Sequence, residues 1–299
     1  MLKHTQKDSV STRSESTDTR RRRGRLVKRI LRNKSIIFGG GLFLVFVLLA
    51  ILGPVLSQQD PMDVSVRDRL MGPARTHLLG TDQMGRDILS RILYGIGLSL
   101  LVGTTVVALA SSIGIMLGLI GAYAERIGPV IMRLVDGLMA FPGLILALAL
   151  VAVLGSRLEN IIAALTFVYT PRVARVVHAI TLELKTREFV YAARAIGVSS
   201  FSVMMKHIFP NALGPAVVQS SFMFASAILS EASLSFLGVG LPPGTPSLGV
   251  MLSEGRMYLL NAPWIVIFPG ATLFVMSLGL NIVGDGVRDL LDPRYRSGT

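Results

Sequence analysis

Apolar runs long enough to cross a bilayer recur along this sequence and leave few fold classes open. A helix needs about 20 predominantly apolar residues to cross the roughly 30 Å hydrocarbon core. Hydrophobic residues make up 51% of the 299-residue chain and charged residues only 16%, which is too apolar for soluble domains. The sequence therefore predicts an all-α, polytopic membrane protein with six transmembrane helices, at roughly 36–56, 95–123, 137–155, 159–178, 212–238 and 262–284.

The run at 159–178 is the weakest of the six. Its clean apolar stretch stops at Pro171 and is followed by Arg172 and Arg175. We expect these two arginines to snorkel from the end of the span to an aqueous face. Without this span, the charged stretch at 183–206 would lie on the opposite side from the basic N-terminus.

Lysine and arginine are distributed unevenly between the two sides that six spans define. With the N-terminus inside, 23 of the 30 Lys and Arg lie on one side, which the positive-inside rule makes cytoplasmic. Both termini are then cytoplasmic. The net charge of +12 would suit nucleic acid, but the four arginines at 20–23 fit a topology determinant that also contacts anionic lipid. We therefore expect the lipid bilayer, and no nucleic acid, as a partner.

The polar segments divide the chain into tails, an outer loop and a transmembrane core. We expect a basic, partly disordered cytoplasmic tail at 1–35, before the first span, and a short cytoplasmic tail at 285–299. The outer loop at 57–94 should carry an interfacial helix. The remaining spans form a transmembrane core at 95–284, which contains a cytoplasmic loop at 182–211.

Two local patterns predict how the second and third runs are built. Pro142 in the third run should kink the helix or start its membrane-embedded part. Small residues recur every four positions in the second run and would let another helix approach closely. These small residues are Ala110, Gly114, Gly118 and Ala122.

The stretch TDQMGRDILSRILYG, at 81–95, carries two acid–base pairs just before the second run. Asp82 lies four residues before Arg86, and Asp87 lies four before Arg91. Apolar residues fall on another face of the same helix, so we expect an amphipathic helix at the outer interface. Exposed pairs contribute only about 0.3–0.5 kcal/mol each, so their value would lie in orientation. A solvated lead-in and an element that touches a ligand both fit this pattern.

The segment LELKTREFVYAARAIGVSSFSVMMKHIFPN, at 182–211, has the pattern of two short helices joined at a glycine. Apolar residues at helical spacing predict an amphipathic helix over 183–196. Gly197 stands where a left-handed residue ends a helix. Ser199 or Ser200 can cap a second helix, which Pro210 should stop. The repeat consists of Phe189, Ala192, Ala193 and Ile196.

This segment can be interpreted in two ways. A loop helix that rests on lipid headgroups is also amphipathic. Such a helix would carry bulky apolar residues at positions 192 and 193 and would not need a hinge. The alanines and the glycine therefore favour an element on which another protein docks.

Four ordered motifs give the chain a specific resemblance. Ala192-Ala193, Gly197 and then His207-Ile208-Phe209-Pro210 resemble the cytoplasmic EAA loop of the membrane permease subunits of ABC importers. Three other stretches resemble the second permease of dipeptide, oligopeptide, glutathione and nickel importers, and the likeness extends over nearly the whole chain beyond residue 30. They are LLGTDQMGRDILSRILYG (78–95), EASLSFLGVGLPP (231–243) and GDGVRDLLDPR (284–294).

The loop departs from the family at two positions. Tyr191 stands where the loop's name-giving glutamate would be, and Phe209 stands where leucine is commoner. Neither departure disturbs the Ala-Ala-Gly spacing, so docking should survive. A contact that depends on the charge of that glutamate is not expected here.

The resemblance implies a type I ABC importer permease fold in the bacterial cytoplasmic membrane. The chain would form half of a translocation pathway for peptides or peptide-like solutes, beside a homologous second permease. It would not be an enzyme, because two ABC ATPase subunits would bind ATP and Mg and an extracytoplasmic binding protein would deliver cargo. The implied coupling residues are Phe189, Ala192, Ala193, Gly197, His207 and Pro210. The implied outer-face signature is Asp82, Gly85, Arg86, Asp87 and Arg91.

Glu231 is the one acid well inside a predicted span, which makes it a candidate functional residue. It can line the cargo path, or it can pack at an interface or gate by hydrogen bonding to Ser230, Ser233 or a partner helix. We prefer the packing role. We expect no catalytic residues, metal or cofactor on this chain, since it has no cysteine, no phosphate-binding loop and no histidine with companions at metal-ligand spacing.

Two other classes of protein compete with the importer. A secondary transporter driven by an ion gradient usually shows several buried acids or paired broken helices, whereas this sequence shows one acid in a span and no internal repeat. A membrane-bound enzyme would need a cluster of nucleophile, base and orienting group. Within the importer class, glutathione, an opine-like compound or chelated nickel are the alternative cargoes.

Overall fold

The chain folds as a bundle of helices, and the computed structural model describes residues 33–57 and 59–291. Residues 1–32 of the tail predicted at 1–35, and residues 292–299 of the tail predicted at 285–299, lie outside the described residues. Within them there is no β-strand, only an isolated bridge between Thr81 and Asp87. The helices are α2 (Lys34–Leu56), α3 (Ile88–Tyr123), α4 (Gly128–Met139), α5 (Gly143–Leu154), α6 (Leu158–Lys185), α7 (Glu188–Ala195), α8 (Ser200–Val203), α9 (Phe209–Phe236), α10 (Leu248–Gly255) and α11 (Trp264–Leu291), with a π turn at Met204–Ile208.

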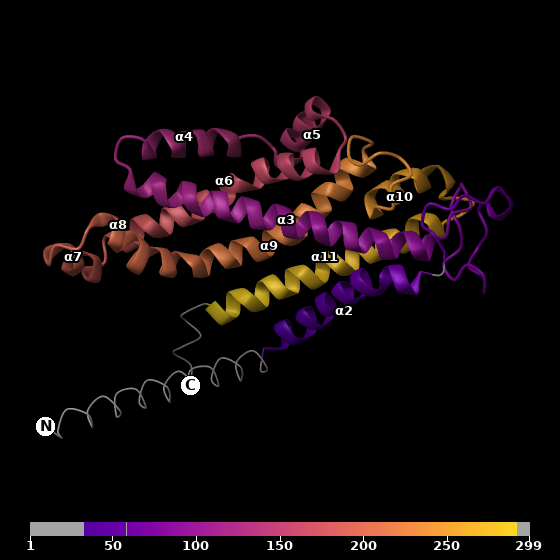
Figure 1. Ribbon diagram of the computed structural model, residues 1–299, viewed down its shortest axis with the longest axis horizontal. Helices are drawn as coiled ribbons and strands as arrows, with labels where there is room; N and C mark the ends of the chain where they lie inside the picture. The colour runs from indigo at the N-terminus through magenta and orange to yellow at the C-terminus, as the bar shows by residue number, and fades with distance from the viewer. Residues whose placement is uncertain (1–32, 58, 292–299) are drawn as a thin grey trace, which may run out of the picture.

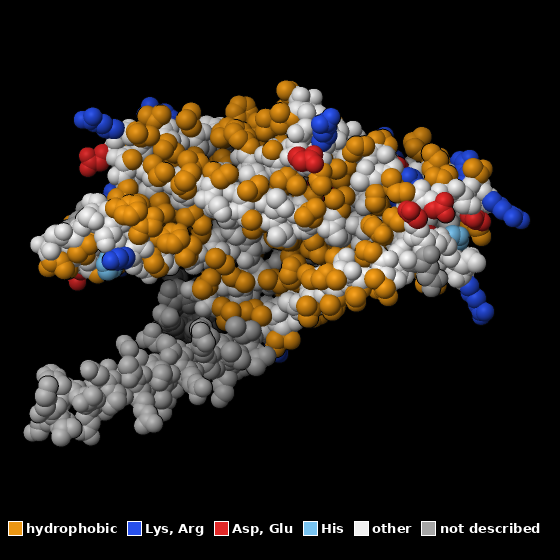
Figure 2. Space-filling model, viewed as in Figure 1, with side chains coloured by type: hydrophobic (Ala, Val, Ile, Leu, Met, Phe, Trp, Pro, Cys, Tyr) orange, Lys and Arg blue, Asp and Glu red, His pale blue; other side chains and the backbone are white. Residues whose placement is uncertain are grey.

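The long helices run along one axis and place the two candidate functional regions at opposite ends. Figure 1 shows α7 and α8 at one end, and α10 with the loop before α3 at the other. On the face drawn in Figure 2, hydrophobic side chains cover the middle of the molecule, and charged side chains gather mainly toward its ends. This distribution is typical of a protein whose middle lies in hydrocarbon.

The expected count of six spans is not exact, although the fold type is correct. Four helices are long and apolar enough to cross a membrane: α2, α3, the continuous stretch Ser200–Phe236, and α11. The pair α4 and α5 would make a fifth, but it is bent by 93°. The 28-residue α6 is long enough but is not among these helices, and its second half carries Arg172, Arg175, Glu183 and Lys185.

The break between α4 and α5 corrects the prediction of one span at 137–155. Two 12-residue helices replace it, and Pro142 stands directly before α5 with ψ 121°. Proline has no N–H for the helix ladder and its ring clashes with the preceding turn, so it interrupts the helix. The predicted proline kink is confirmed, and it is far sharper than a bend within one span.

The predicted small-residue stripe on α3 is the surface against which α6 packs. A Cβ at Gly114 would lie 2.7 Å from the Cβ of Val173, and one at Gly118 would lie 2.6 Å from the carbonyl oxygen of Ala174. Side chains larger than hydrogen would therefore push α6 away. Ala110 and Ala122 on the same stripe are also buried.

Helix α9 contributes to the two largest hydrophobic cores of the bundle. One core joins α9 to α3 and α6 through residues such as Ala212 and Ala227. The other joins α9 to α2, α10 and α11 through residues such as Ile228 and Ala232. Because α9 lies between the two cores, any displacement of α9 must be accommodated by both.

Candidate functional site

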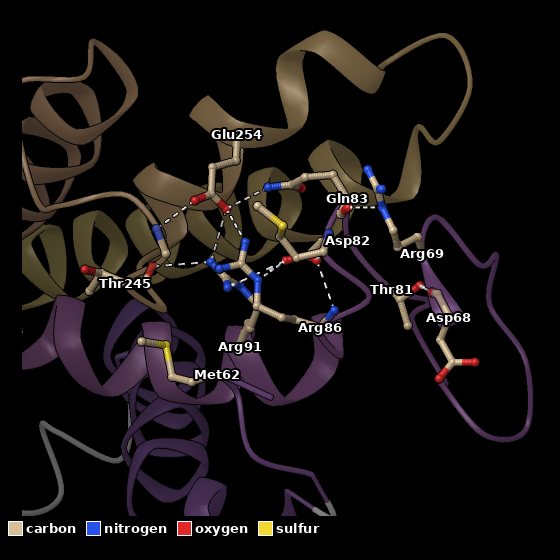
Figure 3. Close-up of polar contacts among 12 residues, drawn as sticks. Met62, Asp68, Arg69, Thr81, Asp82, Gln83, Arg86, Arg91, Thr245 and Glu254 are labelled. Carbon is tan, nitrogen blue, oxygen red and sulfur yellow. Dashed lines mark hydrogen bonds and ion pairs between the residues drawn. The ribbon is translucent and has the colours of Figure 1, made fainter. Parts of the chain in front are cut away.

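A buried ionic cluster lies at the outer end of the bundle, and Figure 3 shows its members pointing toward one another. The Arg86 guanidinium donates to Asp82 through Nε at 2.7 Å and to Glu254 through Nη2 at 2.7 Å. Arg91 lies 3.6 Å from Asp82 and 3.4 Å from Glu254. We call these four residues the outer ionic cluster. Two positive and two negative charges balance within it.

The outer ionic cluster is not the pair of exposed helical ion pairs that the sequence predicted. Asp82 and Arg86 are 3% and 6% exposed, and Arg91 is fully buried. Residues 82–87 are not helical, because α3 begins only at Ile88. The prediction of surface pairs worth a few tenths of a kcal/mol each is therefore wrong, since buried charges carry a large desolvation cost and must be paired.

Asp87 does not pair with Arg91 and instead caps α3. Its Oδ2 accepts the backbone N–H of Ser90 at 2.8 Å, and its Oδ1 lies 3.1 Å from Nδ1 of His77. An aspartate at this position satisfies an N–H group that the first helical turn leaves without a partner. The acid is thus used for capping, which leaves Arg91 to pair with Glu254.

Gly85 makes the turn before α3 possible. Its φ of +79° lies in the left-handed region, and a Cβ there would overlap the carbonyl oxygen of Ser65. The side chain of Asp82 closes this turn by accepting the N–H groups of Met84 and Arg86. The described part of 57–94 contains a 3-10 turn at Val66–Asp68, and the apolar residues expected on the interfacial helix, such as Ile88 and Ile92, lie in the first turns of α3.

Glu254 on α10 completes the cluster, and no sequence pattern predicted its part in it. Its Oε1 accepts the N–H of Gly244 at 2.7 Å, and its Oε2 accepts from Gln83 at 3.1 Å as well as from Arg86. Glu254 is the only acid at 239–261. The signal in the sequence was one acid in the segment 239–261 and several arginines in the segment 57–94. The spacing of nearby residues does not show which arginine the acid pairs with.

Glu231 lies buried in α9 and bonds to the chain just before α10. Its Oε1 accepts hydroxyl hydrogen bonds from Ser235 at 2.9 Å and from Ser247 at 3.0 Å. Its Oε2 has no hydrogen-bond partner among the described residues. Neither serine that was expected as a partner bonds to Glu231: Ser230 bonds to the hydroxyl of Tyr169, and Ser233 donates to the carbonyl of Leu229 in its own helix.

The segment at 182–211 forms a short helix, a glycine turn and a second helical stretch at the opposite end. Helix α6 continues to Lys185, so the first short helix is Glu188–Ala195 rather than 183–196. Gly197 has φ +83°, and the N–H of Val198 bonds to the carbonyl of Ala193 at 3.1 Å, which closes the predicted left-handed cap. Ser199 caps α8 through Ser202, as predicted.

Pro210 does not stop the second helix as predicted. It lies in the first turn of α9, and the helical stretch is continuous over Ser200–Phe236. The π turn at Met204–Ile208 accommodates the missing N–H of the proline, since the N–H of Phe209 bonds five residues back to Met204. We call α7, the turn at Gly197 and α8 the hinge, and the two short helices its arms. The second arm, α8, is therefore the end of a membrane-spanning helix.

The hinge exposes apolar side chains at the end of the molecule. Phe189 is 42% exposed, Ile196 81% and Phe201 68%, and Ala192 is also at the surface. Ala193 is buried against the chain's own core, so only one of the two alanines faces outward. His207 is exposed beside Phe189, with ring centroids 6.3 Å apart. An apolar surface of this kind is typical of a protein-binding site.

Comparison with known proteins gives two matching family models and relatives that align over about nine tenths of their length. Residues 114–297 match the model of the binding-protein-dependent transport system inner membrane component, and residues 23–73 match the N-terminal TM domain of oligopeptide transport permease C. A putative peptide transport system permease protein of Brucella abortus is 44% identical over 90% of this chain and 91% of its own length. The dipeptide transport system permease protein DppC of Alkalihalophilus pseudofirmus is 41% identical over 90% and 89%.

A relative with another cargo and two solved structures complete the comparison. The glutathione transport system permease protein GsiD of Pectobacterium atrosepticum is 39% identical over 90% of each chain. A chain of the inward-facing MetNI methionine ABC transporter superposes with a TM-score of 0.56 at 19% identity and covers 67% of this chain and 96% of its own. A chain of an amino acid ABC transporter gives 0.52 at 17% identity, over 65% and 91%. At such identities the structures support the fold alone.

Proposed function

This chain belongs to the family of binding-protein-dependent transport system inner membrane components and is a permease subunit of an ABC importer, and on that basis we propose that its cargo is a peptide. The observation that supports a peptide is the match of residues 23–73 to the N-terminal domain of oligopeptide permeases, together with relatives named for peptide and dipeptide transport. Glutathione, itself a small peptide, is the second candidate, because GsiD is 39% identical.

The chain is not itself an enzyme and works with ATPase and second permease subunits. We propose two ATPase subunits that carry ATP and Mg, one of which docks on the exposed apolar hinge. Phe189, Ala192 and His207 would contact it, and Gly197 would hold the angle between the two arms. The surface apolar groups and the left-handed cap support this assignment.

The orientation proposed for this multi-pass membrane protein puts both termini and the α7–α8 end in the cytoplasm. The outer ionic cluster then faces the extracytoplasmic side, where a substrate-binding protein would deliver cargo. The excess of Lys and Arg in the predicted cytoplasmic segments supports this orientation. The outer ionic cluster would keep the receiving surface in one shape, because its charges are buried and paired.

The geometry supports a mechanism in which the hinge moves two long helices together. Helix α6 ends two residues before α7, and α8 runs through the π turn into α9 without a break. ATP-driven closure of the ATPase subunits would shift the hinge as a unit and tilt α6 and α9 with it. The pathway would alternate between inward-open and outward-open arrangements.

A reconstituted transport assay tests this function. The chain would be placed in proteoliposomes with its second permease and ATPase subunits, and the binding protein would be supplied outside with labelled dipeptide. We expect uptake that requires ATP and the binding protein, and that glutathione inhibits only weakly. Uptake driven by an ion gradient without ATPase subunits, or ATP-driven uptake of another solute and not of peptide, would contradict the proposal.

A further inference from the structure

An arginine near the middle of α6 faces out of this chain. Arg172 lies 14 residues after Leu158 and 13 before Lys185, which places it about 20 Å from either end of the helix at 1.5 Å per residue. The residue is exposed. Arg175, one turn further on, pairs with Asp136 of α4, whereas no carboxylate of the described residues lies within 4 Å of the Arg172 guanidinium.

Arg172 was expected to snorkel from the end of a span, and it stands near the middle of a longer helix than the predicted 159–178. Because α6 continues to Lys185, Arg172 has more than three helical turns on either side of it, and its side chain does not reach an end of the helix. A guanidinium facing hydrocarbon at mid-depth is costly, and intramembrane charges therefore face a water-filled cavity or a partner group. The face of α6 that carries Arg172 must look onto water or onto an acid.

Arg172 lines a small pocket where the α4–α5 pair is broken. The pocket has a volume of about 110 Å³, and its other walls include Met139, Phe141, Leu146 and Val168. Pockets for whole drug-sized ligands are several times larger, so this one has room for a terminal group. Apolar walls with a single guanidinium suit a carboxylate carried on a short apolar stem.

The guanidinium is held in place and its N–H groups remain available. Its Cζ lies 5.1 Å from the centroid of the Tyr169 ring, and the Tyr169 hydroxyl is fixed by a 2.9 Å hydrogen bond with Ser230 of α9. A cation over an aromatic face is attracted to it. Among the described residues, the Arg172 side chain makes no hydrogen bond. The structure thus presents a positioned donor that lacks an acceptor.

We propose that Arg172 binds the carboxylate of the cargo as it passes through the membrane. This inference rests on the proposed function, because it assumes a peptide cargo with a free C-terminal carboxylate. The site distinguishes a peptide from its C-terminal amide, which offers no charge to the guanidinium. Since α6 leads to the hinge, the contact moves with the helix that the ATPase subunits would tilt.

Direct binding to the nucleotide-free importer in lipid nanodiscs, without binding protein, tests the site. The probes are labelled alanyl-phenylalanine and its C-terminal amide. We expect the wild type to prefer the free peptide by about tenfold or more, and Arg172→Gln to lose that preference while Arg172→Lys keeps part of it. Arg157→Gln, at the exposed start of α6, is the matched control and should bind like the wild type.

Several results would overturn the inference. They are no binding of the free peptide by the wild type, equal binding of peptide and amide, and unchanged binding by Arg172→Gln. Equal loss of both probes in the variant would indicate that Arg172 pairs with an acid of a partner subunit instead. Transport by the wild type is measured in parallel: absent peptide uptake contradicts the proposed function, whereas normal uptake with no Arg172-dependent binding contradicts only this site.

A thiol-labelling experiment tests the exposure of Arg172 to water without any cargo. The chain has no cysteine, so Arg172→Cys introduces a single thiol whose modification is read from the mass of this chain. We expect a charged, membrane-impermeant thiol reagent to modify it in the assembled importer in nanodiscs. Val45→Cys, on the exposed apolar face of α2, is the control; we expect it to face lipid and to stay unmodified. Failure to modify position 172 would also overturn the inference.

Discussion

Replacing Glu254 by glutamine removes one of the two negative charges of the outer ionic cluster. Arg86 and Arg91 would then share only Asp82, and Arg91 is fully buried. Breaking a buried ion pair by removing one partner costs about 3–5 kcal/mol. The Glu254 side chain is 18% exposed and the remaining Asp82 reaches both arginines, so we expect the lower end, about 3 kcal/mol of unfolding free energy.

Thermal unfolding of the purified chain in detergent micelles measures this loss. The chain has a single tryptophan, Trp264, whose indole N–H donates to the carbonyl of Thr81 at 3.2 Å, so its fluorescence reports on this region. At about 2–4 °C per kcal/mol, Glu254→Gln should lower Tm by about 6–12 °C. Glu125→Gln, which changes an exposed acid between α3 and α4, should leave Tm unchanged.

A double variant separates the ionic effect from a general loss of packing. In Glu254→Gln with Arg91→Met, Asp82 and Arg86 remain paired and the cluster is neutral again. The double variant should therefore lose clearly less stability than the sum of the two single variants, because the two residues interact. A loss below about 0.5 kcal/mol for Glu254→Gln, or strict additivity in the double variant, would refute the assignment of a buried, charge-balanced cluster.

Three further substitutions test other features. Gly197→Val should abolish cargo-stimulated ATPase activity while membrane insertion persists, because a branched residue is strained at φ +83°; normal coupling would contradict the hinge assignment. Gly118→Ala should destabilise the chain by about 1–3 kcal/mol, because the added methyl group would push α6 away. Gly137→Ala is the control, since its methyl group meets open space and should not destabilise the chain. Equal Tm values for the two variants would contradict the close contact. Ser247→Ala should lower the free energy of unfolding by about 1–3 kcal/mol, because the buried carboxylate of Glu231 loses a hydrogen-bond donor. Ser233→Ala removes an exposed hydrogen bond and is the near-neutral control. Similar losses of stability in the two variants would contradict the buried hydrogen bond.

Local sequence patterns were sufficient for the features that depend on neighbouring residues. The left-handed cap at Gly197, the serine cap at Ser199 and the break at Pro142 each follow from the backbone preference of one residue type. The stripe that includes Gly114 and Gly118 predicted a close helix partner correctly. It did not reveal that the partner is α6, because that depends on the whole bundle.

Features that depend on distant segments were not predictable in this way. Arg91 pairs with Glu254, which is 163 residues away, and the apparent local partner Asp87 is taken by the cap of α3. The stop expected at Pro210 failed because a π turn absorbed the missing hydrogen bond. In both cases the local rule was sound, and a competing interaction that the pattern does not encode was stronger.

Helix α10 is fastened at both of its ends. At its start, the hydroxyl of Ser247 donates a hydrogen bond to the buried carboxylate of Glu231 on α9. Near its end, Glu254 pairs with Arg86, which lies just before α3. A tilt of α9 that begins at α7 and α8 would therefore move α10 as well. The outer surface on which the substrate-binding protein is proposed to dock would move with α10. Movement at the α7–α8 end of the subunit would thus reach the α10 end through the rigid helix α9. It needs no separate chain of side-chain contacts across the bilayer.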